Sequence, residues 1–93
     1  MEKTFLTQVA KIKGLTVSIM TFHKERLTLN EKAIVVKLYE LMDDIICNRV
    51  YHKNYTAEEY VDSVLMEQSI VLRGSRNSEI KKLSKLLEEG IRW

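Results

Sequence analysis

The chain has 93 residues, a formal net charge of +2, one cysteine and no proline. Its length is that of one domain, and its 45% hydrophobic and 30% charged residues are typical of a globular protein rather than a disordered one. A single cysteine excludes an internal disulfide, and no apolar run approaches the ~18 residues of a membrane span. We therefore expect one globular domain over residues 1–93, located in the cytoplasm.

Positive and negative charges are segregated along the chain. Residues 1–37 contain seven Lys or Arg and three acidic residues, residues 38–68 contain two and seven, and residues 69–93 contain six and three. Two interpretations fit this segregation. Antiparallel helices neutralise one another on folding, or a basic or acidic patch binds a partner of opposite charge.

The first expected helix covers residues 3–13, where apolar residues recur at helical spacing, and Gly14 is expected to end it. Residues 15–22 alternate apolar and polar side chains and are rich in β-branched residues, which is compatible with a strand. A lone strand leaves its backbone groups unpaired unless a second copy of the chain supplies an edge. A second short helix is therefore the preferred interpretation, and an inter-chain strand is the alternative.

The longest expected helix, residues 29–51, follows a capping box. Thr28 and Glu31 have the Thr-x-x-Glu spacing in which each side chain bonds to the backbone N–H of the other residue. Nine apolar residues fill about half of the helix circumference, which is wider than the stripe of a surface helix. These residues are Ile34, Val35, Leu38, Tyr39, Leu41, Met42, Ile45, Ile46 and Val50. We expect this helix to be the central element of the fold and to contact neighbours on two sides.

Two further helices are expected in the second half of the chain. The capping-box spacing recurs at Thr56, before a helix over residues 57–72, and a last helix covers residues 79–89. Gly74 and Gly90 occupy positions where helices often end in a left-handed residue. The core face of the 57–72 helix is expected to comprise Ala57, Tyr60, Val61, Val64, Leu65, Val71 and Leu72. The sequence thus predicts an all-α fold, a small bundle of four to five helices around the long central helix.

Few residues have the chemistry of an active site or a metal centre. Cys47 follows Asp43 and Asp44 by about one helical turn, and nearby anions disfavour the reactive thiolate. The chain has neither a glycine-rich phosphate loop nor a zinc-binding cysteine pair. We therefore expect no enzyme activity, no cofactor and no metal.

Apolar residues on one face of the expected 57–72 helix indicate a protein-binding surface. Met66 and Ile70 lie one turn apart, on the side away from the expected core face, and contiguous exposed apolar residues mark contact surfaces. Acidic residues are expected to border the pair: Glu59, Asp62 and Glu67. We expect this face to bind a protein partner stoichiometrically, as in a regulator, an immunity-type inhibitor or a chaperone. We also expect the chain to form a homodimer.

The alternative function is that of a small DNA-binding transcriptional regulator. Five basic residues of the region 73–85 are candidates for phosphate contacts: Arg73, Arg76, Lys81, Lys82 and Lys85. However, the six-residue connection RGSRNS is longer than the turn of a helix-turn-helix motif. Glu88 and Glu89 are also spaced to pair with Lys85. Protein binding is therefore the preferred interpretation.

Overall fold

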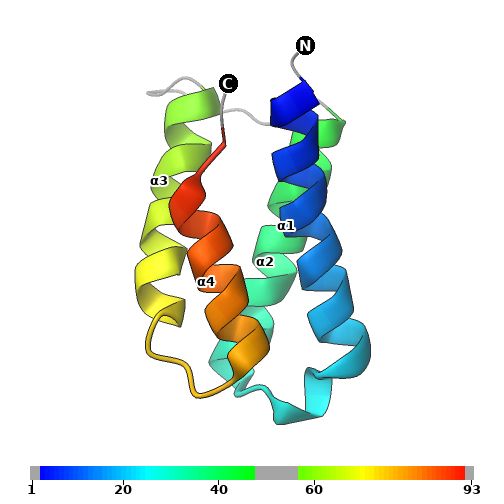
Figure 1. The fold of residues 1–93 in the computed structure, drawn as a ribbon, viewed down its shortest axis with the longest axis vertical. Coiled ribbons are helices and arrows are strands. Elements are labelled where there is room, and N and C mark those ends of the chain that lie inside the picture. The colour runs from blue at the N-terminus through cyan, green and yellow to red at the C-terminus, as the bar shows by residue number, and fades with distance from the viewer. Residues whose placement is uncertain (1–2, 48–56, 92–93) are drawn as a thin grey trace.

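The computed structural model describes residues 3–47 and 57–91, and in these residues it contains helices and no strand. The helices are α1 (Lys3–Phe22), a short 3-10 helix η1 (Lys24–Arg26), α2 (Leu29–Ile46), α3 (Ala57–Leu72) and α4 (Ser78–Glu89). The four α-helices run alternately up and down, side by side (Figure 1). The prediction of a small all-α bundle is confirmed.

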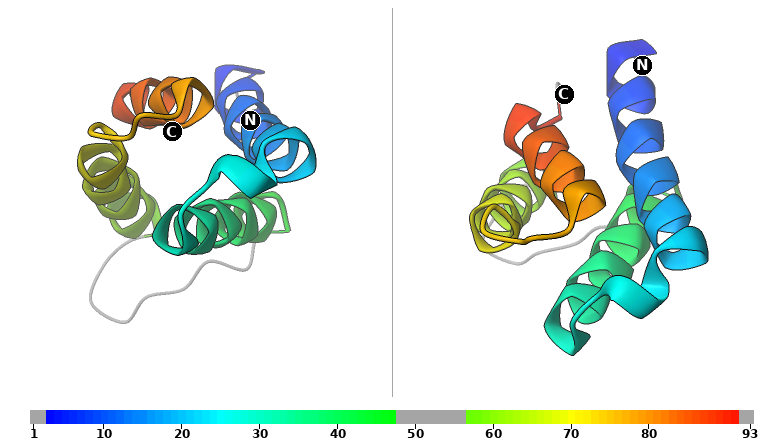
Figure 2. Two further views of the ribbon diagram at one scale, coloured as in Figure 1. Left: turned by 90° about the horizontal axis from the view of Figure 1, so that it is seen from below. Right: turned by 60° about the horizontal axis from the view of Figure 1, so that its bottom comes forward.

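The four α-helices surround a common core, as the end-on view shows (Figure 2). α1 packs along α2, α3 packs along α4, and α1 also contacts α4, whereas α2 and α3 contact each other sparingly. α2 is therefore one wall of the bundle, and the prediction that it lies at the centre is wrong. The buried hydrophobic residues are Val9, Ile12, Ile19, Leu27, Ile34, Val35, Leu38, Leu41, Met42, Val61, Leu65, Leu72, Ile80, Leu83, Leu87 and Ile91.

The first helix does not end at Gly14, and residues 15–22 form neither a separate helix nor a strand. α1 continues through both, because its buried stripe continues through Thr16 to Ile19. The Thr16 hydroxyl donates to the Lys13 carbonyl oxygen at 2.6 Å, so this polar residue is buried with its hydroxyl bonded. The prediction that Gly14 ends the helix is therefore wrong, and the exposed Val17 and Phe22 lie outside the buried stripe of the same helix.

The capping box at the start of α2 is confirmed. The Glu31 N–H donates to Thr28 Oγ1 at 3.1 Å, and the Thr28 N–H donates to Glu31 Oε1 at 3.0 Å. The buried face is narrower than predicted, because Tyr39 and Ile46 at its edge are 37% and 48% exposed. α2 ends at Ile46, with Cys47 as its C-cap, which is earlier than the predicted end at residue 51. Residues 48–51 themselves lie outside the described residues.

α3 has the predicted bounds but is rotated relative to the predicted core face. Val71 is 50% exposed, and Tyr60 and Val64 are half-buried. Gln68 and Ser69 are buried in their place, beside Val61, Leu65 and Leu72. The predicted capping box at Thr56 and the predicted core residue Ala57 lie outside the part of the chain whose side chains are described.

The two glycines after α3 and α4 behave differently. Gly90 ends α4 with a φ of 68° and a ψ of −166°. The positive φ explains why glycine stands at this helix end, as expected, although the ψ differs from that of a left-handed helical residue. Gly74 does not adopt a positive φ, so the corresponding prediction for α3 is wrong. α3 closes instead with a hydrogen bond from the Arg73 N–H to the Ser69 carbonyl, and the Asn77 side chain caps α4 by accepting from the Glu79 and Ile80 N–H groups.

The loop between α3 and α4 is joined to the start of α2. The Ser75 hydroxyl donates to Glu31 Oε2 at 2.6 Å and accepts from the Asn77 N–H at 3.1 Å. Glu31 therefore serves the capping box with one oxygen and the loop with the other. This contact connects the two helical hairpins at one end of the bundle.

Candidate protein-binding site

The outer face of α3 carries the predicted partner-binding residues. Met66 is 53% exposed and Ile70 is 57% exposed, whereas Val61 and Leu65 on the opposite side of the same helix are buried. Four residues of helix separate the two exposed side chains by about 6 Å along the axis. Met66 and Ile70 therefore form a pair of neighbouring apolar side chains directed away from the core.

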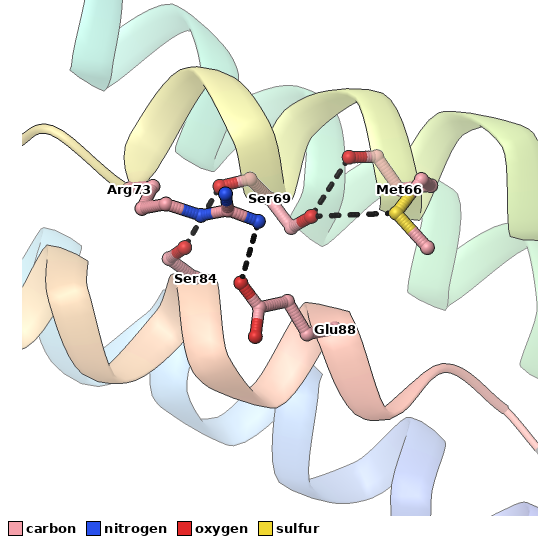
Figure 3. A network of polar contacts seen from close by, with 5 residues as sticks. All are labelled: Met66, Ser69, Arg73, Ser84 and Glu88. Atoms are coloured by element: carbon pink, nitrogen blue, oxygen red, sulfur yellow. Dashed lines mark hydrogen bonds and ion pairs between the residues drawn. The ribbon is translucent and has the colours of Figure 1, made fainter.

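Polar contacts between α3 and α4 fix the orientation of this face (Figure 3). The Ser84 hydroxyl of α4 donates to the Ser69 carbonyl of α3 at 2.8 Å. The Ser69 hydroxyl donates to the Met66 carbonyl at 2.7 Å and lies 4.0 Å from Met66 Sδ. Arg73 Nη2 lies 3.0 Å from Glu88 Oε1, across the outer edge of the same seam. Met66 is thus linked through Ser69 to the contact between α3 and α4.

The three predicted acidic residues are exposed on α3. Helical spacing places Glu59 and Asp62 on the side that carries Met66, and Glu67 on its flank. Five residues selected from the sequence therefore share the solvent-facing part of one helix. The surface, here called the α3 outer face, comprises Glu59, Asp62, Met66, Glu67 and Ile70.

Two of the five basic residues of the alternative hypothesis make ion pairs within the bundle. Arg73 is paired with Glu88, and Lys82 Nζ lies 3.0 Å from Glu79 Oε2. Lys81 and Lys85 are exposed on α4. Glu88 therefore pairs with Arg73 across the seam between α3 and α4, whereas its spacing in the sequence predicted a pair with Lys85.

Arg76 lies in a hollow that sequence reasoning missed. The hollow has a volume of about 460 Å³ at the end of the bundle where η1 meets the start of α4. His23 and Arg26 line it together with Arg76 and Lys82, and the Glu79 carboxylate contacts His23 Nε2 at 3.7 Å. No local pattern joins Arg26 to Arg76, because fifty residues separate them and only the folded bundle brings them together.

An apolar groove between α1 and α2 is the second feature that sequence reasoning missed. It has a volume of about 290 Å³ and is lined by Thr16, Val17, Met20, Thr21, Val36 and Tyr39. At one end, Lys13 Nζ lies 5.4 Å from the centroid of the Tyr39 ring and 3.2 Å from Asp43 Oδ1. The signal in the sequence was the position of Val17 and Val36 outside the buried stripes of their helices.

The described side chains include no group of three or more His, Cys, Asp and Glu residues placed to hold a metal ion. Cys47 is exposed at the end of α2. No helix in the described part of the chain combines the length and the apolar character of a membrane span. No family model matches the chain, and no curated protein or solved structure matches it significantly.

Proposed function

We propose that this chain is a protein-binding module that acts stoichiometrically, as a regulator, inhibitor or chaperone, through the α3 outer face. The observation that carries the proposal is the exposure of Met66 and Ile70, one turn apart on a helix whose other side is fully packed. The four helices already share a buried core to which neither side chain contributes. Large apolar side chains gathered on one helix face are characteristic of helix-mediated recognition.

The acidic residues of this face favour a basic partner. Glu59, Asp62 and Glu67 surround the apolar pair with negative charge. Charges at the rim of an interface speed association and set orientation more than they increase affinity. The partner that fits is a basic amphipathic helix that inserts apolar side chains beside Met66 and Ile70 and presents Lys or Arg to the acids.

The double change Met66→Ser and Ile70→Ser tests this proposal. Burying the two side chains in a partner contributes about 2–4 kcal/mol, so we expect the dissociation constant to rise by about 30- to 900-fold. A partner captured from the source cells and then purified is titrated against both proteins by calorimetry. Thermal unfolding should be nearly unchanged, because neither side chain belongs to the core.

Phe22→Ser combined with Leu29→Ser is the matched control. These two side chains are 76% and 83% exposed but belong to α1 and α2 rather than to α3, so their removal should leave partner binding intact. Equal affinity of the Met66 and Ile70 variant and the unmodified protein contradicts the proposal. Unfolding of that variant also contradicts it, because the pair would then stabilise the fold rather than a complex.

We propose nucleic-acid binding as the second candidate function, on the basis of the basic hollow between η1 and α4. Arg26 and Arg76 line this hollow, and neither makes an ion pair with another described residue. Two uncompensated guanidinium groups beside Lys82 fit a phosphate backbone. The nearby Glu79 carboxylate and the acidic α3 outer face weigh against a large nucleic-acid footprint.

This second candidate predicts salt-dependent binding of duplex DNA. Neutralised phosphates release counterions, so affinity should fall steeply between 50 and 200 mM salt. Arg26→Gln with Arg76→Gln should weaken binding to all sequences alike, and Lys81→Gln with Lys85→Gln on the exposed side of α4 is the matched comparison. Absence of a gel shift at low salt removes this candidate and leaves protein binding unaffected.

A further inference from the structure

The apolar groove lies between α1 and α2, and none of its lining residues belongs to α3. Its walls contain no charged side chain. Val36 is 40% exposed at this groove, and Val17 and Tyr39 beside it are similarly exposed. The groove is thus a contact surface separate from the α3 outer face.

The charges beside the groove are arranged symmetrically about Val36. Lys32 precedes Val36 by four residues and Glu40 follows it by four, so the three side chains lie along one side of α2. Neither Lys32 nor Glu40 makes an ion pair with another described residue. One strip of helix therefore carries a positive end, an apolar centre and a negative end.

This order of charges is complementary to itself when the helix is turned end for end. We propose that the groove is the centre of a homodimer, in which α2 of one copy lies antiparallel to α2 of the second copy. The two-fold axis then passes between the two Val36 side chains, and Glu40 of each copy lies opposite Lys32 of the other. The second possible two-fold axis, parallel to the helices, brings Lys32 against Lys32 and is disfavoured.

The size of the surface indicates a weak, reversible dimer. α2 has 18 residues, which corresponds to about 27 Å of helix, and the pair of helices is about 20 Å wide. Such a face lies near the lower end of the range for specific interfaces, which bury about 800 Å² per partner. We expect a dissociation constant on the order of ten micromolar, measurable by sedimentation equilibrium.

Val36→Asp tests the apolar centre. Because both copies carry the change, two carboxylates would face each other at the axis, and we expect dimerisation to weaken by at least about 100-fold. The matched control is Val71→Asp, the same change at a half-exposed valine of α3, which should dimerise like the unmodified protein. Helix content and thermal unfolding at low protein concentration show that both variants remain folded.

Charge reversal provides the test that is specific to a second copy. Glu40→Lys alone and Lys32→Glu alone each place like charges opposite each other twice per dimer, so each variant should self-associate about 10-fold or more weakly. A mixture of the two variants restores opposite charges at both contacts, and we expect mixed dimers to form with the original affinity. A heterologous partner in the groove gives no such recovery on mixing.

Four outcomes overturn this proposal. The chain is monomeric at several hundred micromolar, or Val36→Asp and Val71→Asp change self-association equally, or the charge-reversed variants do not recover when mixed. The fourth outcome is that the unmodified chain is monomeric and Val36→Asp loses binding to a different protein. This result would assign the groove to a heterologous partner rather than to a second copy. All of these measurements are independent of the α3 outer face.

Discussion

Leu38→Ala is expected to lower the free energy of unfolding by about 2–5 kcal/mol. Leu38 is completely buried on α2, and truncating it removes apolar contacts and leaves a cavity between the helices. A domain of this size has a stability of about 5–14 kcal/mol, so the change removes a large share of it. Urea unfolding followed by circular dichroism should show a lower midpoint with an unchanged slope.

Leu29→Ala on the same helix is the matched control for Leu38→Ala. Leu29 is the most exposed of the described large apolar residues, at 83%, and it lies in the first turn of α2. Its truncation should change the stability by less than about 0.5 kcal/mol. Equal effects of the two changes would show that α2 is not packed with Leu38 toward the core.

Ser84→Leu is expected to destabilise the bundle by about 1–3 kcal/mol, through overpacking. Ser84 is 3% exposed at the seam between α3 and α4, where its hydroxyl contacts the Ser69 carbonyl. A leucine side chain at this position forces the two helices apart. The same change at the exposed Ser63 of α3 is the matched control and should be close to neutral.

Ser84→Ala separates the loss of the hydrogen bond from the effect of size. The Ser69 carbonyl also accepts from the Arg73 N–H at 3.0 Å, so it keeps a partner when the hydroxyl is removed. We therefore expect Ser84→Ala to cost less than about 1 kcal/mol, clearly less than Ser84→Leu. If alanine destabilises as much as leucine, the hydrogen bond rather than close helix packing maintains the seam.

The two proposed contact surfaces lie on different sides of the bundle and do not compete. The groove is lined by residues of α1 and α2 alone, so dimerisation through it leaves the α3 outer face of each copy uncovered. A dimer therefore presents two Met66 and Ile70 pairs, and a partner with two basic helices would bind with the added strength of a bivalent contact. Val36→Asp should remove this added strength while it leaves single-site affinity unchanged.

The sequence by itself determined the helical class and several helix boundaries, because these depend on local interactions. The Thr28 and Glu31 side chains lie within one helical turn of the groups that they bond, so their spacing is sufficient to locate the start of α2. Gly90 similarly marks the end of α4 with its positive φ. Met66 and Ile70 were separated from the core by helical periodicity alone, and the structure places both at the surface.

Only the tertiary structure determined how wide the buried face of each helix is. Periodicity shows which side of a helix is apolar, but the neighbouring helices set how much of that side is covered. Val71 was predicted in the core and is half exposed on α3, whose contacts with α2 are sparse. Tyr39 was also predicted in the core and lies instead at the partly open groove between α1 and α2. Thr16 and Ser84 are polar by type and are buried, because each hydroxyl finds a backbone carbonyl there.

Local sequence patterns also could not predict contacts between residues that are far apart in the chain. Arg26 and Arg76 share one hollow, and Ser75 bonds to Glu31, only because the two helical hairpins pack side by side. Spacing rules describe neighbours within about one helical turn, whereas these pairs are more than forty residues apart. The local chemistry of the chain therefore specifies its helices, and the packing of those helices specifies which of their side chains remain available for binding.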